Sequence, residues 1–200
     1  GMQGADRIFL RLPLDSPLRD CARSAGFTAI RYEVVYTLKR AMRPIYGTLA
    51  SGLRSRRPVD AHEVYRLYNS ATPVDTRAAI GMTFEQWNDS RDAPGNSVKE
   101  YVCTDGDRVS GWLRLDSRRP EIRVDATLLD PTSSASLGLV SDAATIAPQH
   151  SRAKWLVPES MPSLGYALES QSWIQERGYE LFASSTASKA RENALQALQV

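Results

Sequence analysis

The chain has 200 residues, of which 42% are hydrophobic, and its 25 basic and 23 acidic residues leave a formal charge of +2. This length and composition suit one folded domain of ordinary size with an additional segment. So balanced a charge argues against whole-surface binding to nucleic acid or to an anionic membrane, and the apolar runs are far shorter than the ~20 residues that cross a bilayer. We therefore expect no nucleic acid and no membrane as partners.

The two cysteines, Cys21 and Cys103, are too few for a disulfide framework and lack the spacing of a zinc site. We interpret them as free thiols in a reducing compartment, and we expect no metal. Residues 2–6 lack the basic and apolar regions of a signal peptide. These observations predict a cytoplasmic protein.

The first 44 residues are predicted to form a strand, a helix and a second strand. Residues 7–14 begin as a strand, Ser16 and Pro17 are typical of a helix start, and Gly26 is typical of a helix end. Residues 27–39 have the Val, Tyr, Thr and Ile content of a strand. Because so short a unit cannot bury enough apolar surface alone, we predict that it pairs with the sheet of the remaining chain or with its copy in a homodimer.

A basic stretch follows, with Lys39, Arg40, Arg43, Arg54, Arg56 and Arg57 and no acid among them. We interpret residues 45–59 as a solvated basic linker. The alternative is a patch for nucleic acid or an acidic partner, although Tyr46 is the one aromatic residue interleaved with these charges.

Three capping-box patterns then predict three helix starts. They are Asp60 with Glu63, Thr72 with Asp75, and Thr83 with Gln86. The apolar residues of these helices, such as Val64 and Trp87, are most simply core. The alternative is that the helices line a pocket for an acceptor substrate.

Residues 98–115 read as a hairpin, because Asp105-Gly106-Asp107 suits a tight turn between two strand-like runs. A third strand is predicted over residues 121–129, and Asp130-Pro131 ends it. The loop of Thr132–Ser136 carries no bulky side chain, and a helix is predicted over residues 137–147. This loop is either a phosphate cradle, in which helix N–H groups approach an anion, or an ordinary turn with a Ser or Thr cap.

The last third of the chain repeats the pattern of the first segment. A strand is predicted over residues 153–157, a helix over residues 163–177 ended by Gly178-Tyr179, and a strand over residues 180–183. A final helix is predicted over residues 189–200. The order of strand, helix, Gly-aromatic pair and strand thus occurs twice.

From residue 60 onward this element order resembles the GNAT superfamily of acyl-CoA N-acyltransferases. The resemblance implies an α+β (mixed α/β) fold with a mixed, splayed central sheet over residues 60–200. Residues 1–44 look like the rear half of a second GNAT-like unit, as in tandem members. The resemblance also implies that the strands at 124–129 and 153–157 diverge, with acetyl-CoA or another acyl-CoA lying between them.

The resemblance places the cofactor on the end of the central strand and the loop after it, namely Leu128, Leu129, Thr132, Ser133, Ser134, Ala135, Ser136, Leu137 and Gly138. The family's diphosphate loop has Arg or Gln followed by two Gly positions, which fall here on Ser134, Leu137 and Leu139. Asp130 adds local repulsion. We therefore expect weak coenzyme A binding unless a basic residue, such as Arg152 or one from the linker, closes over the diphosphate.

Acyl transfer to an amine also needs a group that accepts the amine proton. Many relatives use a Tyr four residues before the Gly-aromatic pair, where this chain has Ile174. Glu159 is the base candidate by position, followed by Asp125 and Glu100. Two functions stay open: an N-acyltransferase that modifies an unidentified small-molecule or peptide amine, and a catalytically inactive GNAT-like module for ligand sensing or assembly.

Overall fold

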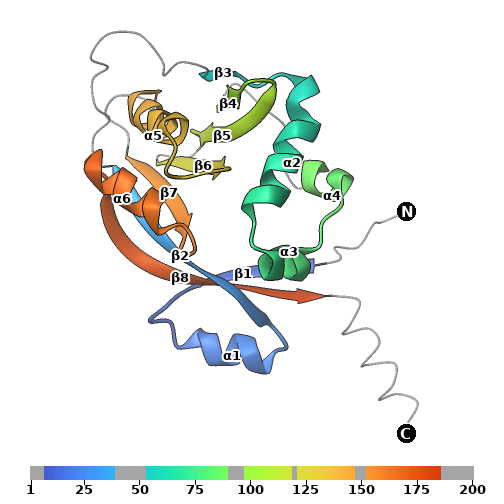
Figure 1. Ribbon diagram of the computed structural model, residues 1–200. Coiled ribbons are helices and arrows are strands. Elements are labelled where there is room, and N and C mark those ends of the chain that lie inside the picture. The colour runs from blue at the N-terminus through green and yellow to red at the C-terminus, as the bar shows by residue number, and fades with distance from the viewer. Residues whose placement is uncertain (1–6, 39–52, 90–96, 119–120, 147–151, 186–200) are drawn as a thin grey trace, which may run out of the picture.

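The computed structural model describes residues 7–38, 53–89, 97–118, 121–146 and 152–185 (Figure 1). Within these ranges the strands form an eight-stranded sheet in the order β1-β8-β2-β7-β6-β5-β4-β3. The strands are β1 (Arg7–Pro13), β2 (Thr28–Leu38), β3 (Leu53–Ser55), β4 (Val98–Asp105), β5 (Arg108–Asp116), β6 (Ile122–Leu128), β7 (Ala153–Pro158) and β8 (Ile174–Ser185). Since β6 and β7 are parallel and the other neighbours antiparallel, the predicted mixed sheet is confirmed.

Helices cover both faces of this sheet. They are α1 (Leu18–Ser24), α2 (Ala61–Ala71), α3 (Val74–Ile80), α4 (Phe84–Asp89), α5 (Ser134–Ile146) and α6 (Pro162–Ser170). Figure 1 shows α5 and α6 on one side of the central strands and α2, α3 and α4 on the other. One core cluster includes Leu139 of α5, Leu164 of α6 and Trp155 of β7, and another packs Leu67 of α2 against Trp112 of β5.

The first segment completes the sheet of its own chain. Strand β2 lies between β7 and β8 and is antiparallel to both, while β1 pairs with the outer side of β8. Helix α1 joins β1 to β2, and its Ala22 packs with Leu12 and Phe182. The predicted pairing with the sheet of the remaining chain is therefore confirmed.

The two strand-helix-strand units, β1-α1-β2 and β7-α6-β8, are interleaved. Each has two parallel strands, and one strand of the other unit lies between them. Their helices also end alike: Gly26 has φ 79° and Ser172 has φ 66°. The N–H of Phe27 donates to the carbonyl of Ala22, and that of Trp173 donates to the carbonyl of Leu168, both at 3.0 Å.

This geometry corrects the predicted end of the last helix. Helix α6 ends at Ser170, and Gly178-Tyr179 lies inside β8. The helical spacing of apolar residues continues by coincidence to Ile174, although Ser172 already has the left-handed conformation that ends a helix. Gly178 is instead suited to close packing, because a Cβ there would lie 2.5 Å from Cδ1 of Leu14.

The stretch predicted to be a linker contains structure. Leu53–Ser55 forms β3 and pairs with β4, so the prediction of a solvated connector is wrong for these residues. Residues 39–52 lie outside the described ranges, and so do residues 189–200, for which a final helix is predicted.

Two capping predictions are also wrong. The carboxylate of Asp60 binds Arg54 instead of capping α2, and the hydroxyl of Thr72 donates to the carbonyl of Tyr68.

The third capping box is confirmed, since Thr83 and Gln86 each bond the other's backbone N–H. Helix α5 begins at Ser134, three residues earlier than predicted. The hairpin is confirmed, with Gly106 at φ 58° in its turn. The capping box and the hairpin are both decided by residues close in sequence.

Candidate functional site

Strands β6 and β7 diverge along their length. They pair only from Ile122 to Val124 on β6, against Ala153 to Trp155 on β7. Because the N–H of Leu129 donates to the carbonyl of Ser110 on β5, the alternation of the strand turns the backbone groups of Ala126 and Leu128 toward β7. Within the described part of the chain, nothing pairs with these groups. The predicted divergence is therefore confirmed.

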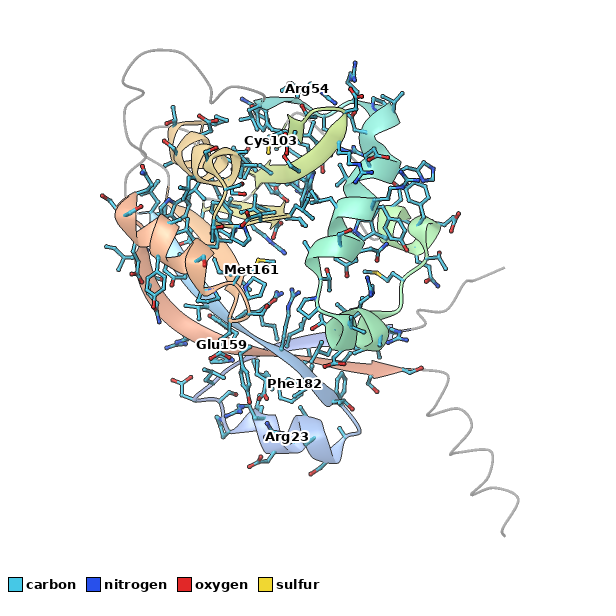
Figure 2. All side chains as sticks on the ribbon, viewed as in Figure 1. Arg23, Arg54, Cys103, Glu159, Met161 and Phe182 are labelled. Atoms are coloured by element: carbon cyan, nitrogen blue, oxygen red, sulfur yellow. The ribbon has the colours of Figure 1, made fainter. Side chains whose placement is uncertain are left out.

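The gap between the two strands leads to a cavity of about 270 Å³ on the face that carries α2 and α4. Residues of seven elements line it, among them Arg11, Arg31, Glu33, Tyr68, Thr72, Trp87, Trp112, Arg114, Arg123, Asp125, Ala126, Thr127, Leu156 and Pro158. Met161 also contributes, and Figure 2 shows its side chain in the space between α6 and α2. The cavity is thus walled by aromatic rings of α2, α4 and β5 and by charged groups of β1, β2, β5 and β6.

A buried ion cluster occupies one side of the cavity. Glu33 is 1% exposed, and its carboxylate accepts hydrogen bonds from Nε of Arg11 at 2.6 Å and from Nε and Nη2 of Arg31 at 2.9 and 2.6 Å. Burial alone raises the pKa of Glu33, but the two guanidinium groups outweigh it and lower that pKa overall. Glu33 therefore stays ionised and is poorly suited to accept a proton.

Strand β6 supplies the opposite side. Arg123, Asp125 and Thr127 alternate onto one face of the strand, and Arg123 contacts Oδ1 of Asp125 at 3.1 Å. On β5, Arg114 lies opposite Asp125 in register and contacts Asp116 at 3.9 Å. Among the three carboxylates considered from the sequence, Asp125 is the one that lines the cavity.

The other two carboxylates lie elsewhere. Glu159 is exposed, and its N–H donates to the carbonyl of Tyr32 at 3.0 Å, which extends the pairing of β7 with β2. Figure 2 shows Glu159 below Met161, toward β2 and β8. Glu100 forms an ion pair of 2.9 Å with Arg56. Neither residue is among those lining the cavity.

The small-residue loop is held by its own hydrogen bonds. Oδ1 of Asp130 accepts from the N–H of Thr132 at 2.8 Å and from its hydroxyl at 2.6 Å. The Thr132 hydroxyl and nearby backbone N–H groups lower the pKa of Asp130. Ser133 caps α5 by accepting from the N–H of Ser136 at 3.2 Å. The loop is therefore a capped helix start with an ionised carboxylate beside it.

Other predicted cofactor residues are placed around this cap. Leu128 directs its backbone into the gap, Leu129 and Leu137 are exposed, and Gly138 lies in α5. Within the described ranges, the N–H groups of Ser134 and Ala135 have no hydrogen-bond acceptor, whereas those of Thr132, Ser133, Ser136 and Leu137 are bonded inside the loop. Two donors thus remain for an anion at this helix end.

Arg152 cannot assist this loop, so that prediction was wrong. Its carbonyl accepts from the N–H of Ile122, at the beginning of β6, and its side chain contacts Glu121 and Glu176 at 3.7 Å. The loop follows the other end of β6, and a strand of this length spans roughly 20 Å. Because β6 and β7 are parallel, Arg152 before β7 lies beside the beginning of β6, whereas the loop follows the end of β6.

The corrected end of α6 also moves the family's tyrosine position. Ile174 begins β8, and Ser172-Trp173 occupies the place of the Gly-aromatic pair. Four residues earlier lies Leu168, which is 0% exposed. By either alignment this chain has an aliphatic residue where many relatives have Tyr.

Arg11, Arg31 and Glu33 were missed as site residues by the sequence reasoning. The one available signal is that Arg31 and Glu33 alternate onto one face of an otherwise apolar strand. Within the described residues, no group of three His, Cys, Asp or Glu side chains is arranged to hold a metal ion. None of the described helices is long and apolar enough to cross a membrane.

No family model and no curated protein matches this sequence. Solved structures do match. A GCN5-related N-acetyltransferase from Sphaerobacter thermophilus superposes with a TM-score of 0.57 at 13% identity, over 90% of this chain and 60% of that one. The fold is that of the GCN5-related N-acetyltransferases, or GNAT proteins.

Two further solved structures are similar to this chain. A GCN5-related N-acetyltransferase from Anabaena variabilis has a TM-score of 0.53 at 13% identity, over 88% of this chain and 45% of its own. A functionally unknown conserved protein from Staphylococcus epidermidis has a TM-score of 0.60 at 10% identity, over 90% of this chain and 72% of its own. This chain therefore spans less than two thirds of both named acetyltransferases, and at such identities the likeness shows the GNAT fold alone.

Proposed function

We propose that this protein is an N-acyltransferase that moves an acyl group, in the simplest case acetyl, from coenzyme A to an amine. The observation that carries this proposal is the gap between β6 and β7, into which Ala126 and Leu128 direct unpaired backbone groups. The amides of a pantetheine arm can pair with such groups as an added strand does. The free N–H groups of Ser134 and Ala135 suit a phosphate, although the charge of Asp130 opposes it.

The cavity provides groups for the chemistry. An amine nitrogen attacks the thioester carbonyl carbon, the carbon–sulfur bond breaks, and the thiolate leaves. The amine proton passes to Asp125, directly or through water, and is released when the next substrate binds. A backbone N–H in the gap, such as that of Ala126, donates to the carbonyl oxygen as negative charge develops there.

A catalytically inactive GNAT-like module for ligand sensing or assembly is the second candidate. Leu168 at the tyrosine position and the carboxylate of Asp130 beside the helix start favour this alternative. Loss of a charge-assisted contact in the loop costs about 1.5 to 3 kcal/mol of binding. Binding of acyl-CoA is therefore the measurement that separates the two candidates first.

The experiment is calorimetric titration of the full chain with acetyl-CoA, using two substitutions at one position. Ala126→Pro removes the N–H that faces the gap, whereas Ala126→Gly retains it. Neither change breaks a bond to β5, because the backbone of Ala126 faces away from that strand. We expect Ala126→Pro to weaken binding about five- to tenfold, the effect of one hydrogen bond, and Ala126→Gly to bind nearly as the wild type does.

Equal binding by both variants would show that the gap does not hold the ligand. Absence of any heat from the wild type at millimolar acetyl-CoA would favour the inactive module. Circular dichroism of both variants checks that the sheet is intact.

A further inference from the structure

Glu33 orients two arginine side chains at the edge of the cavity. Its carboxylate engages one nitrogen of Arg11 and two of Arg31. A guanidinium carries five N–H donors in a rigid plane, and within the described ranges no acceptor binds either Nη of Arg11 or Nη1 of Arg31. Because Glu33 is 1% exposed and both arginines line the cavity, donors that are already positioned remain for another acceptor.

A third arginine lies across the cavity. Arg123 binds one oxygen of Asp125, and its side chain is 55% exposed. Four arginines therefore line the concave site, against two carboxylates, Glu33 and Asp125. The fourth is Arg114, which contacts Asp116, and apolar groups such as the rings of Trp87 and Trp112 form other parts of the walls. Such walls weaken the screening of charge by solvent, so an excess of positive charge attracts anions more strongly here than on an open surface.

We propose that the acceptor amine carries an anionic group, a carboxylate or a phosphate, which Arg11 and Arg31 bind. Guanidinium groups match both anions through paired N–H donors. The anion is thereby held by β1 and β2, while the amine faces Asp125 on β6. The statement about the amine rests on the proposed acyltransferase function, whereas binding of the anion at Arg11 and Arg31 does not.

Matched ligand pairs test this inference on the full chain without acetyl-CoA. One pair is β-alanine and β-alaninamide, and the other is O-phosphoethanolamine and ethanolamine. We expect the anionic member of at least one pair to bind about tenfold more tightly by calorimetry, and comparison of the two pairs identifies the preferred anion. Equal affinity within both pairs, or absence of binding by all four compounds, would overturn the inference.

Arginine substitutions locate the anion. Arg31→Gln is expected to weaken binding of the anionic compound about tenfold, as loss of a charge-assisted hydrogen bond does. Arg66→Gln is the control, because Arg66 is exposed on α2 and pairs with Glu63 at 3.0 Å away from the cavity. Its affinity should equal that of the wild type.

Arg31→Gln leaves Glu33 with one fewer partner, so thermal melting is used to check that this variant is folded. Arg123→Gln is the second variant, since this exposed residue contributes little to stability, and we expect it to weaken binding about threefold. If neither Arg31→Gln nor Arg123→Gln changes the affinity more than Arg66→Gln does, the anion does not bind at these arginines and the inference fails.

Thiol release from acetyl-CoA separates this inference from the proposed function. Release with the anionic amines and much less with the neutral ones supports both. Equal release with anionic and neutral amines supports the acyltransferase and overturns the inference. Binding of the anionic compounds without binding of acetyl-CoA overturns the acyltransferase and leaves the anion site in place.

Discussion

Asp60 fixes the chain between β3 and α2 through hydrogen bonds that the sequence did not suggest. Its two oxygens accept from Nη1 and Nη2 of Arg54 at 2.7 and 2.8 Å, and Oδ2 also accepts from the N–H of Arg57 at 2.6 Å. The Arg54 hydrogen bonds are the main cause that lowers the pKa of Asp60 to about 2. Because the unfolded-state pKa lies near 3.8, ionised Asp60 stabilises the fold above about pH 4, and this contribution is lost as the pH falls toward 2.

Asp60→Asn should therefore lower the free energy of unfolding at pH 7 by about 1 to 2 kcal/mol, allowing for partial solvent exposure of Arg54. Near pH 2 most of this difference should be lost, because the wild-type carboxyl group is about half protonated in the folded state at its own pKa. Urea denaturation at both pH values measures the difference. Asp20→Asn is the control, since the side chain of Asp20 is 93% exposed; a loss for Asp60→Asn that did not depend on pH would contradict the explanation.

At the scale of elements, close contacts set how the helices lie on the sheet. Gly165 allows α6 to approach β2, because a Cβ at this position would lie 2.6 Å from the hydroxyl oxygen of Tyr36. The same hydroxyl lies 3.4 Å from Oε1 of Gln175 on β8. Tyr36 thus contacts a helix and two strands, and a larger side chain at position 165 should therefore disturb the packing of the Tyr36 ring.

Gly165→Ala should lower the free energy of unfolding by about 1 to 2 kcal/mol, because overpacking outweighs the better helix propensity of Ala. Tyr36→Phe removes the atom that the new methyl group would meet. The double variant should therefore be about 1 kcal/mol more stable than the sum of the single effects, as a denaturation cycle would measure. Ser163→Ala, at a half-buried position in the first turn of the same helix, should change stability by less than about 0.5 kcal/mol; additive effects at Gly165 and Tyr36 would contradict the contact.

The elements that the sequence predicted well are those decided by neighbouring residues. Gly106 specifies the turn of the β4–β5 hairpin, and Thr83 and Gln86 satisfy the first turn of α4. The end of α6 was misplaced because nothing near Ser172 in the sequence marks its left-handed backbone. Asp60 was misread as a cap because its partner, Arg54, is brought close only when β3 pairs with β4.

At the scale of the whole molecule, the candidate site depends on how the two strand-helix-strand units interleave. The divergence of β6 and β7 followed from the family resemblance, which depends on element order. The arginine cluster could not be predicted in this way, because Arg11 and Arg31 reach the cavity only when β2 lies between β7 and β8. The first segment therefore completes the sheet and also supplies one wall of the cavity.

Interleaved strands should unfold together, and Thr37 provides a test. Its hydroxyl is buried on β2 and has no hydrogen-bond partner within the described ranges. Thr37→Val replaces this hydroxyl with a methyl group of similar size. Since an unpaired buried hydroxyl is costly and Val favours strands, we expect the free energy of unfolding to rise by about 1 kcal/mol in urea denaturation.

Hydrogen exchange then shows how far the effect of Thr37→Val extends. If the two units form one cooperative structure, slowly exchanging amides of β2, β7 and β8 should all gain the same free energy of protection. Thr145→Val is the control, because the Thr145 hydroxyl donates to the carbonyl of Ser141 at 3.1 Å and its loss should not stabilise the fold. Slower exchange confined to β2 would mean that the first segment opens independently, and the cavity would then lose its Arg11 and Arg31 wall without unfolding of the remaining sheet.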